Sequence, residues 1–186
     1  MDISNPNNLY NLNRHNPTPN CNYLLDDRIM FGWYPCSTST GPLSNNVKDI
    51  LKTGRNVFVN LTSIKERSEL YNYIPDVLGA VEAPIFINYP IKDVGLPLDI
   101  DSYIKLIDLL HSLVVRGDKL YIHCRGGHGR SGIVAACLLI HMGYDNQEAL
   151  DLISKAHKTR SYIPDYPCPQ TEEQIEFVRQ YKSKQI

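Results

Sequence analysis

Cys124 and Arg130 carry the residue types best suited to chemistry in this chain. They belong to the run His123-Cys124-Arg125-Gly126-Gly127-His128-Gly129-Arg130-Ser131-Gly132. Backbone N–H groups in such a glycine-rich loop at a helix N-terminus form an anion site. A thiolate at the floor of that site is a nucleophile, and a guanidinium at its rim binds two phosphate oxygens at once. These residues therefore predict cleavage of a phosphate ester through a cysteinyl-phosphate.

The rest of the run fits the same chemistry. Gly126, Gly127 and Gly129, which lie between Cys124 and Arg130, allow positive φ and a close approach of the backbone to the ligand. The Ser131 hydroxyl can donate to the cysteine sulfur, which would help the thiolate leave in a second step. We expect His123 to organise the loop rather than to react. The expected phosphate-binding residues are Arg125, Gly126, Gly127, His128, Gly129 and Arg130.

The elements around this run indicate an α/β fold with a central, mostly parallel sheet flanked by helices. A strand over residues 120–123 delivers Cys124, and an apolar helix over 130–142 follows the loop. Asp99 caps a helix with one apolar face, which ends at Gly117. Alternation of strands and helices predicts a mostly parallel sheet. Further strands are expected over 28–34, 56–61 and 85–89, and further helices over 43–52, over 63–73, after Asp145 and after Thr171.

The run resembles the His-Cys-x5-Arg-Ser/Thr-Gly signature of cysteine-dependent protein tyrosine and dual-specificity phosphatases. The resemblance extends from about Arg28 to Val178. It implies the same fold, with the signature loop at the C-terminal end of a strand. The length is typical of a compact dual-specificity domain. The Gly-His-Gly-Arg-Ser stretch is also similar to phosphatases associated with cyclin-dependent kinases.

A proton donor for the leaving oxygen is expected upstream. The segment Asp93-Val94-Gly95-Leu96-Pro97 matches the Asp-x-Gly-x-Pro of the family's mobile acid loop. Ile91-Lys92 replaces the Trp-Pro that precedes it in tyrosine-specific members, as in dual-specificity relatives. Helix and strand separate Asp93 from Cys124, as a crossover between neighbouring strands requires. The resemblance implies that Asp93 is the general acid and then the general base.

Gln170 is the candidate for positioning the water that hydrolyses the phospho-cysteine. The stretch Pro169 to Gln174 resembles the glutamine loop of tyrosine-specific phosphatases, with Gln174 as the companion residue. The same residues are also a capping box, in which Thr171 and Gln174 open an amphipathic helix. Both interpretations are open at this point.

Composition favours an intracellular enzyme, cytoplasmic or nuclear. The formal net charge of −1 gives no global basic field for nucleic acid or a membrane surface. There is no apolar run long enough to span a bilayer and no apolar signal segment at the N-terminus. The five cysteines are an odd number without metal-ligand spacing, which argues against zinc and against a disulfide framework. We expect neither metal nor cofactor, and Cys36 or Cys168 could protect Cys124 as a reversible disulfide.

Two parts of the chain differ in character. Residues 1–22 are rich in asparagine and proline and predict an irregular N-terminal arm, and residues 23–186 form the catalytic domain. The arm could pack on its own domain or cross to a second copy, so a monomer and a homodimer are both open.

We expect the substrate to be a phosphoprotein, from which the enzyme removes phosphate at phosphotyrosine and at phosphoserine or phosphothreonine. The basic residues Arg125 and His128 leave two alternatives with the same loop, a phosphoinositide phosphatase and an RNA 5′-triphosphatase. A catalytically silent phosphate-binding module is a third, although such modules lose the cysteine, the arginine or the acid, and all three are present here.

Overall fold

The computed structural model describes residues 15–25, 27–36, 45–163 and 165–182. In these residues a five-stranded sheet has the order β1-β2-β5-β3-β4. The strand β1 pairs with β2 in antiparallel fashion, and the other three pairings are parallel. The strands are β1 (Cys21–Leu25), β2 (Ile29–Gly32), β3 (Val57–Asn60), β4 (Ile85–Asn88) and β5 (Leu120–His123).

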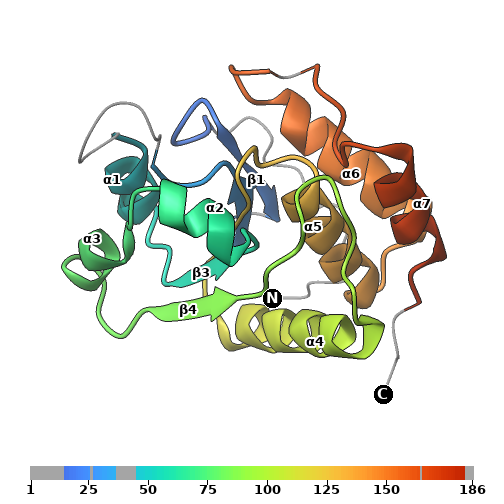
Figure 1. Ribbon diagram of the computed structural model, residues 1–186, viewed down its shortest axis with the longest axis horizontal. Coiled ribbons are helices and arrows are strands. Elements are labelled where there is room, and N and C mark those ends of the chain that lie inside the picture. Colours follow the sequence, from blue (N-terminus) through green and yellow to red (C-terminus); the bar gives the residue numbers. More distant parts are fainter. Residues whose placement is uncertain (1–14, 26, 37–44, 164, 183–186) are drawn as a thin grey trace.

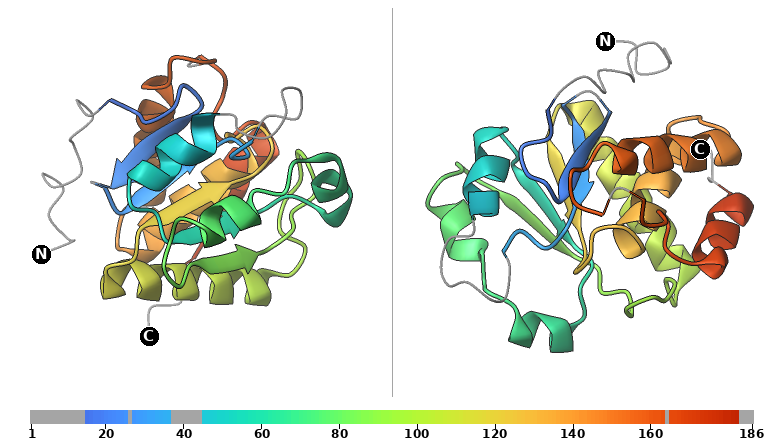
Figure 2. Two further views of the ribbon diagram at one scale, coloured as in Figure 1. Left: turned by 90° about the vertical axis from the view of Figure 1, so that its left-hand side faces the viewer. Right: turned by 90° about the horizontal axis from the view of Figure 1, so that it is seen from above.

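Helices cover both faces of the sheet (Figure 1). Seen from above, α1 and α3 lie on one side of the strands, and α5 and α6 lie on the other (Figure 2). The helices are α1 (Asn45–Lys52), α2 (Ile64–Glu69), α3 (Ile74–Leu78), α4 (Ile100–Arg116), α5 (Arg130–His141), α6 (Asn146–Lys158) and α7 (Glu172–Gln180).

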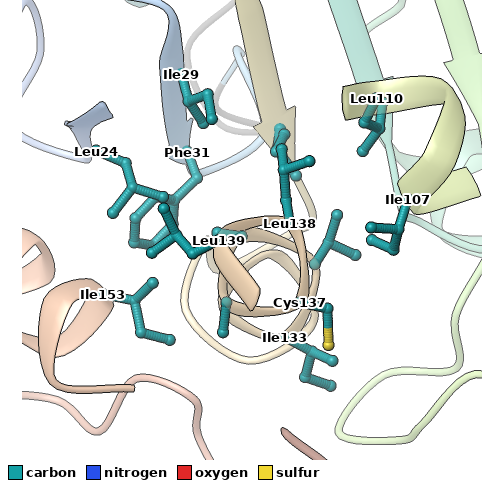
Figure 3. Close-up of a cluster of buried hydrophobic side chains, with 14 of the residues drawn as sticks. Leu24, Ile29, Phe31, Ile107, Leu110, Ile133, Cys137, Leu138, Leu139 and Ile153 are labelled. Carbon is teal, nitrogen blue, oxygen red and sulfur yellow. The ribbon is translucent and has the colours of Figure 1, made fainter. Parts of the chain in front are cut away.

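Alternate residues of the central strands supply the two cores, because successive side chains of a strand point to opposite faces. Leu120 and Ile122 of β5 join the larger core with α4, α5 and α6, whereas Tyr121 joins the smaller core with α1 and α3. Helix α5 is buried along almost its whole length. Figure 3 shows its side chains surrounded by those of β1, β2, α4 and α6. The loop that begins α5 is therefore attached to a helix that the core encloses on nearly all sides.

Local capping sets the helix ends as the sequence predicts. The Asp99 carboxylate accepts from the amides of the first turn of α4, and Asp145 does the same for α6. Gly117 ends α4 with a φ of 105°, a left-handed conformation that favours glycine. Thr171 caps α7 by accepting from the Gln174 amide.

The predicted fold class is confirmed: the sheet is mostly parallel and lies between helices. Two expectations differ from the structure. Residues 21–22, placed in the arm, begin β1, which pairs across a hairpin with β2. The single helix expected over 63–73 is instead the short α2, with α3 following it, because Pro75 at the start of α3 favours a new helix. Most of the arm, residues 1–14, lies outside the described residues.

Candidate active site

Cys124 lies at the C-terminal end of the central strand β5, between the ends of β2 and β3. Its side chain is 2% exposed, yet it lines a cavity of about 190 Å³. The Gly127 N–H donates to Cys124 Sγ at 3.1 Å, and the thiol lies 3.6 Å from Ser131 Oγ. The sulfur is thus at the floor of an open cavity and within reach of donors that stabilise a thiolate.

The loop after Cys124 turns its carbonyls away from the cavity. The Tyr34 N–H donates to the Arg125 carbonyl, and the Cys168 thiol donates to the His128 carbonyl. In a trans peptide the C=O and the next N–H point in opposite directions. The amides that follow these carbonyls, those of Gly126 and Gly129, are therefore directed toward the cavity.

Gly127 is required by its surroundings. Its φ is +72°, and a Cβ built there would lie 2.3 Å from the carbonyl carbon of Gly32. Any other residue would both strain the backbone and clash with β2. The loop can approach the sheet this closely only with glycine at this position.

Arg130 begins α5 and is fully buried beside the cavity. Its two terminal nitrogens donate to Glu66 Oε2 at 2.8 Å and to Oε1 at 2.9 Å, a bidentate pair. Nη1 also donates to the Ile91 carbonyl, and Nη2 to Asp93 Oδ1 at 2.7 Å. These contacts fix the plane of the guanidinium at the edge of the cavity.

Glu66 is a site residue that the sequence did not reveal. Ser63 and Glu66 form a reciprocal capping box at the start of α2, which orients the carboxylate. Burial alone would raise the pKa of Glu66, but Arg130 and the Ser63 amide together lower it from 4.5 to about 2. The only available signal was the Ser-x-x-Glu spacing, which specifies a helix start and not a partner.

Asp93 reaches the same cavity from the loop between β4 and α4. Its side chain is 62% exposed, so it stands at the mouth. The turn behind it closes with a hydrogen bond from Gly95 N–H to the Lys92 carbonyl. The structure therefore brings the predicted acid, nucleophile and arginine together.

The two glutamines differ in position. Gln170 lines the cavity, whereas Gln174 is fully buried beside it. Gln174 Oε1 accepts from the Gln170 N–H at 3.0 Å, and its Nε2 donates to the Gly95 carbonyl at 3.1 Å. Gln174 therefore connects the acid loop to the segment that presents Gln170, while its backbone N–H is capped by Thr171.

The two histidines of the signature run, His123 and His128, carry no positive charge at neutral pH. Burial, followed by the charge of Arg160, lowers the pKa of His128 from 6.5 to about 4. Burial lowers the pKa of His123 to about 3, and its Nε2 lies 2.8 Å from the Tyr73 hydroxyl. His128 lines the cavity as a neutral ring.

Arg125 also lines the cavity. Its guanidinium is about half exposed and lies 3.5 Å from Glu69 at the end of α2. In the part of the chain that the structure describes, no group of three or more His, Cys, Asp or Glu side chains is arranged to hold a metal ion. No helix among these residues is long and apolar enough to cross a membrane.

The fold and the site define a class of protein: a cysteine-dependent phosphatase, with a thiol, a fixed guanidinium and a carboxylate around one anion-binding loop. The chain matches the family model for the DSP-PTPase phosphatase domain of the PTP-SAK (Swiss Army Knife) group over residues 35–186. It therefore belongs to the dual-specificity branch of the cysteine-dependent protein tyrosine phosphatases.

Individual relatives agree with this membership. The protein named "Putative tyrosine phosphatase 067L" of Invertebrate iridescent virus 3 is 33% identical over 143 residues, which cover 74% of this chain and 53% of the relative. Cyclin-dependent kinase inhibitor 3 of Rattus norvegicus is 28% identical over 148 residues, or 76% and 64% of the two chains. The chain thus spans about half the length of the viral relative.

Solved structures share the fold. Tk-PTP in its active form has a TM-score of 0.65 at 22% identity, covering 85% of this chain and 93% of that one. Kinase associated phosphatase with its catalytic site cysteine replaced by serine has a TM-score of 0.58 at 24% identity, covering 73% and 72%.

Proposed function

We propose that this chain hydrolyses phosphate monoesters of phosphoproteins, on tyrosine and on serine or threonine, through a cysteinyl-phosphate. One observation carries the proposal: Cys124, Arg130 and Asp93 all line a single cavity of about 190 Å³. Relatives named as a tyrosine phosphatase and as a cyclin-dependent kinase inhibitor support a protein substrate.

In the first step the Cys124 thiolate attacks phosphorus, and the bond from phosphorus to the leaving oxygen breaks. Arg130 and the inward amides of the loop stabilise the equatorial oxygens. Asp93, protonated, gives its proton to the leaving oxygen. Its position at the mouth of the cavity suits that transfer, because the leaving group points outward.

In the second step water attacks the phospho-cysteine and the thiolate leaves. Asp93, now a carboxylate, takes a proton from the water. Gln170 lines the cavity and positions the water. The Ser131 hydroxyl, 3.6 Å from the sulfur, stabilises the thiolate as it departs.

Arg130 also prepares the acid. Its Nη2 donates to both Glu66 and Asp93 in the structure. A bound phosphate dianion competes with Asp93 for this donor, whereas Glu66 holds the guanidinium by two bonds and keeps it in place. Phosphate binding would therefore release Asp93 to face the leaving oxygen.

The rim favours a substrate with a single phosphate. Arg125 is paired with Glu69, and the neutral His128 adds no cation. A phosphoinositide or an RNA 5′-triphosphate would need further cations for its other phosphates. These two substrate classes are consequently the alternatives against which the proposal is tested.

The test is a turnover panel at fixed pH with a phosphotyrosine peptide, a phosphothreonine peptide, a phosphoinositide and a 5′-triphosphorylated RNA. We expect kcat/KM to be highest on the peptides, and Cys124→Ser to abolish turnover while still binding inorganic phosphate. Asp93→Asn should reduce kcat by about 10²-fold or more, and most for alkyl leaving groups. Activity in the Cys124→Ser variant would overturn the mechanism, and preference for the lipid or the RNA would overturn the substrate class.

We also propose an intracellular, reducing compartment and a monomeric state. All five cysteines are free thiols and buried, which supports the first. The described end of the arm packs on its own domain: the Asn16 side chain donates to Thr159, and the Tyr162 N–H donates to the Pro19 carbonyl. Analytical ultracentrifugation of the full chain would reveal a dimer if the arm instead crosses to a second copy.

A further inference from the structure

Arg160, just beyond the end of α6, is a buried arginine with no role in the mechanism above. It is 2% exposed, and its guanidinium stacks over the Phe31 ring at 5.0 Å. Its Nε donates to Asn22 Oδ1 at 2.7 Å. Its Nη2 donates to the Phe31 carbonyl at 3.2 Å and to the Gly127 carbonyl at 2.8 Å. The side chain thus joins β1 and β2 to the phosphate loop.

The charge of Arg160 has no carboxylate partner among the described residues. Its acceptors are an amide oxygen and two carbonyls, and its Nη1 has no hydrogen bond there. Burial lowers the pKa of Arg160, but a guanidinium remains charged at neutral pH. Arg130, by contrast, is neutralised by the bidentate carboxylate of Glu66. An uncompensated buried cation is costly unless an anion lies close to it.

The acidic groups that interact electrostatically with the charge of Arg160 are Cys168, Tyr121, Cys21 and Cys124, of which Cys124 belongs to the phosphate loop. The contact with the Gly127 carbonyl also has a geometric consequence, because it directs the His128 N–H of the same peptide toward the cavity. The Gly127 N–H in turn donates to Cys124 Sγ. One side chain therefore affects both the electrostatics and the shape of the loop.

We propose that Arg160 is a positioning residue of the phosphate loop, which holds the Gly127–His128 peptide with its amide inward and supplies the unpaired positive charge that favours the Cys124 thiolate. The proposal rests on the function proposed above and deepens it. The experiment that tests Arg160 measures the reactivity of the Cys124 thiol and not turnover. A failure of the Arg160 proposal can therefore be distinguished from a failure of the proposed phosphatase function.

The test follows the rate of Cys124 alkylation by iodoacetamide as a function of pH, with Cys124→Ser subtracting the other thiols. Arg160→Gln keeps one donor and removes the charge. We expect the midpoint of the pH profile of alkylation to rise by about one pH unit. Inhibition of the alkylation by inorganic phosphate should weaken about tenfold. Arg160→Lys keeps the charge, so the midpoint of its alkylation profile should move less than that of Arg160→Gln. Because lysine cannot reach all the same acceptors, inhibition of the alkylation by inorganic phosphate should still weaken.

Arg55 offers a matched control. It is fully buried, donates to the Asp27 carbonyl and lies over the Tyr23 ring. Arg55→Gln should lower the thermal denaturation midpoint without moving the alkylation profile. The variants leave unchanged the other titratable or charged groups around the loop, which include Tyr121, His123, Glu66, Asp93, Arg125, His128, Arg130, Cys168, Cys21 and His157.

An unchanged alkylation midpoint and unchanged phosphate inhibition in a folded Arg160→Gln variant would overturn the proposal. If that variant does not fold, Asn22→Ala removes the anchor of Arg160 on β1, together with the bond from Asn22 Nδ2 to the Tyr23 carbonyl, at a residue that does not line the cavity. Weakened phosphate inhibition in Asn22→Ala would then support the role of Arg160, and parental inhibition would refute it.

Discussion

Glu66→Gln tests whether Arg130, the arginine that we propose to be catalytic, depends on a charge supplied by a neighbouring helix. The substitution keeps the shape of the side chain and one acceptor oxygen, but removes the negative charge opposite Arg130. In the structure this pair is almost excluded from solvent, because the Arg130 side chain is 2% exposed and the Glu66 side chain is 11% exposed. The variant therefore leaves a buried guanidinium that pairs, among the described residues, with the carboxylate of Asp93 alone.

The expected cost follows from that geometry. Removing one partner of a buried ion pair destabilises a protein by about 3–5 kcal/mol, because the other charge stays buried. The exposed Asp93 carboxylate retains its bond to Arg130, which offsets part of that loss. We therefore expect the free energy of unfolding to fall by about 2 kcal/mol at pH 7. Catalysis should fall as well, because Asp93 becomes the main partner of Arg130 and is less free to act as the acid.

The assay is urea denaturation of parent and variant across pH, paired with kcat on an aryl phosphate. The pKa of Glu66 is lower in the folded state than its ordinary 4.5, so its stabilisation is complete above pH 4.5 and is lost as pH falls toward 2. The difference between parent and variant should consequently narrow below pH 4.5. Added inorganic phosphate should stabilise the variant, because the anion supplies the missing charge.

A Glu66→Gln variant with the stability and kcat of the parent at pH 7 would refute this reasoning. A difference in stability that stays constant from pH 7 to pH 3.5 would refute the electrostatic part of it alone. Glu69→Gln is the matched control, since the pair of Glu69 with Arg125 is half exposed and such pairs contribute little.

Three further predictions concern the loop and the water. Gly127→Ala should lower the free energy of unfolding by about 2 kcal/mol and weaken inhibition by inorganic phosphate, since its φ is +72° and a Cβ would meet β2; parental values in both assays would contradict this. The pKa of His128 falls to about 4 in the folded state, so stability held by the neutral ring is present above pH 6.5 and lost as pH falls toward 4. In His128→Gln the thermal denaturation midpoint should therefore change less between pH 7 and pH 4 than in the parent. A pH dependence equal to that of the parent would contradict this prediction. Gln170→Ala should slow hydrolysis of the phospho-cysteine about tenfold, giving a burst of leaving group in rapid-quench experiments, whereas equal slowing of both phases would exclude a role in the second step.

Local signals predicted the part of the site that is continuous in sequence. The strand–loop–helix around Cys124 follows from an apolar strand, a glycine-rich loop and an apolar helix. The cap at Asp99 and the stop at Gly117 were equally readable. In each case the residues that determine the conformation lie within a few positions of one another, so spacing alone carries the information.

Contacts between distant segments were not predictable in the same way. The short β1 has few strand-forming residues and exists because it pairs with β2 and packs under Arg160. The partner of Arg130 lies 64 positions away in a polar helix that could have faced solvent. For Gln174 the glutamine-loop and helix-cap interpretations are compatible in the structure. Its backbone N–H donates to the capping residue Thr171, and its side-chain Oε1 accepts from the Gln170 N–H.

The balance of charge explains why these distant residues are needed. The loop itself brings one buried cation, Arg130, to the cavity, and a buried charge that has no partner opposes folding. Glu66 compensates Arg130 from α2, and Asp93 does so from the acid loop. An anionic substrate that displaces Asp93 restores the same balance with its own charge. In the mechanism proposed above, binding of phosphate and release of Asp93 are therefore a single exchange at the Arg130 guanidinium, and the signature motif alone does not provide it.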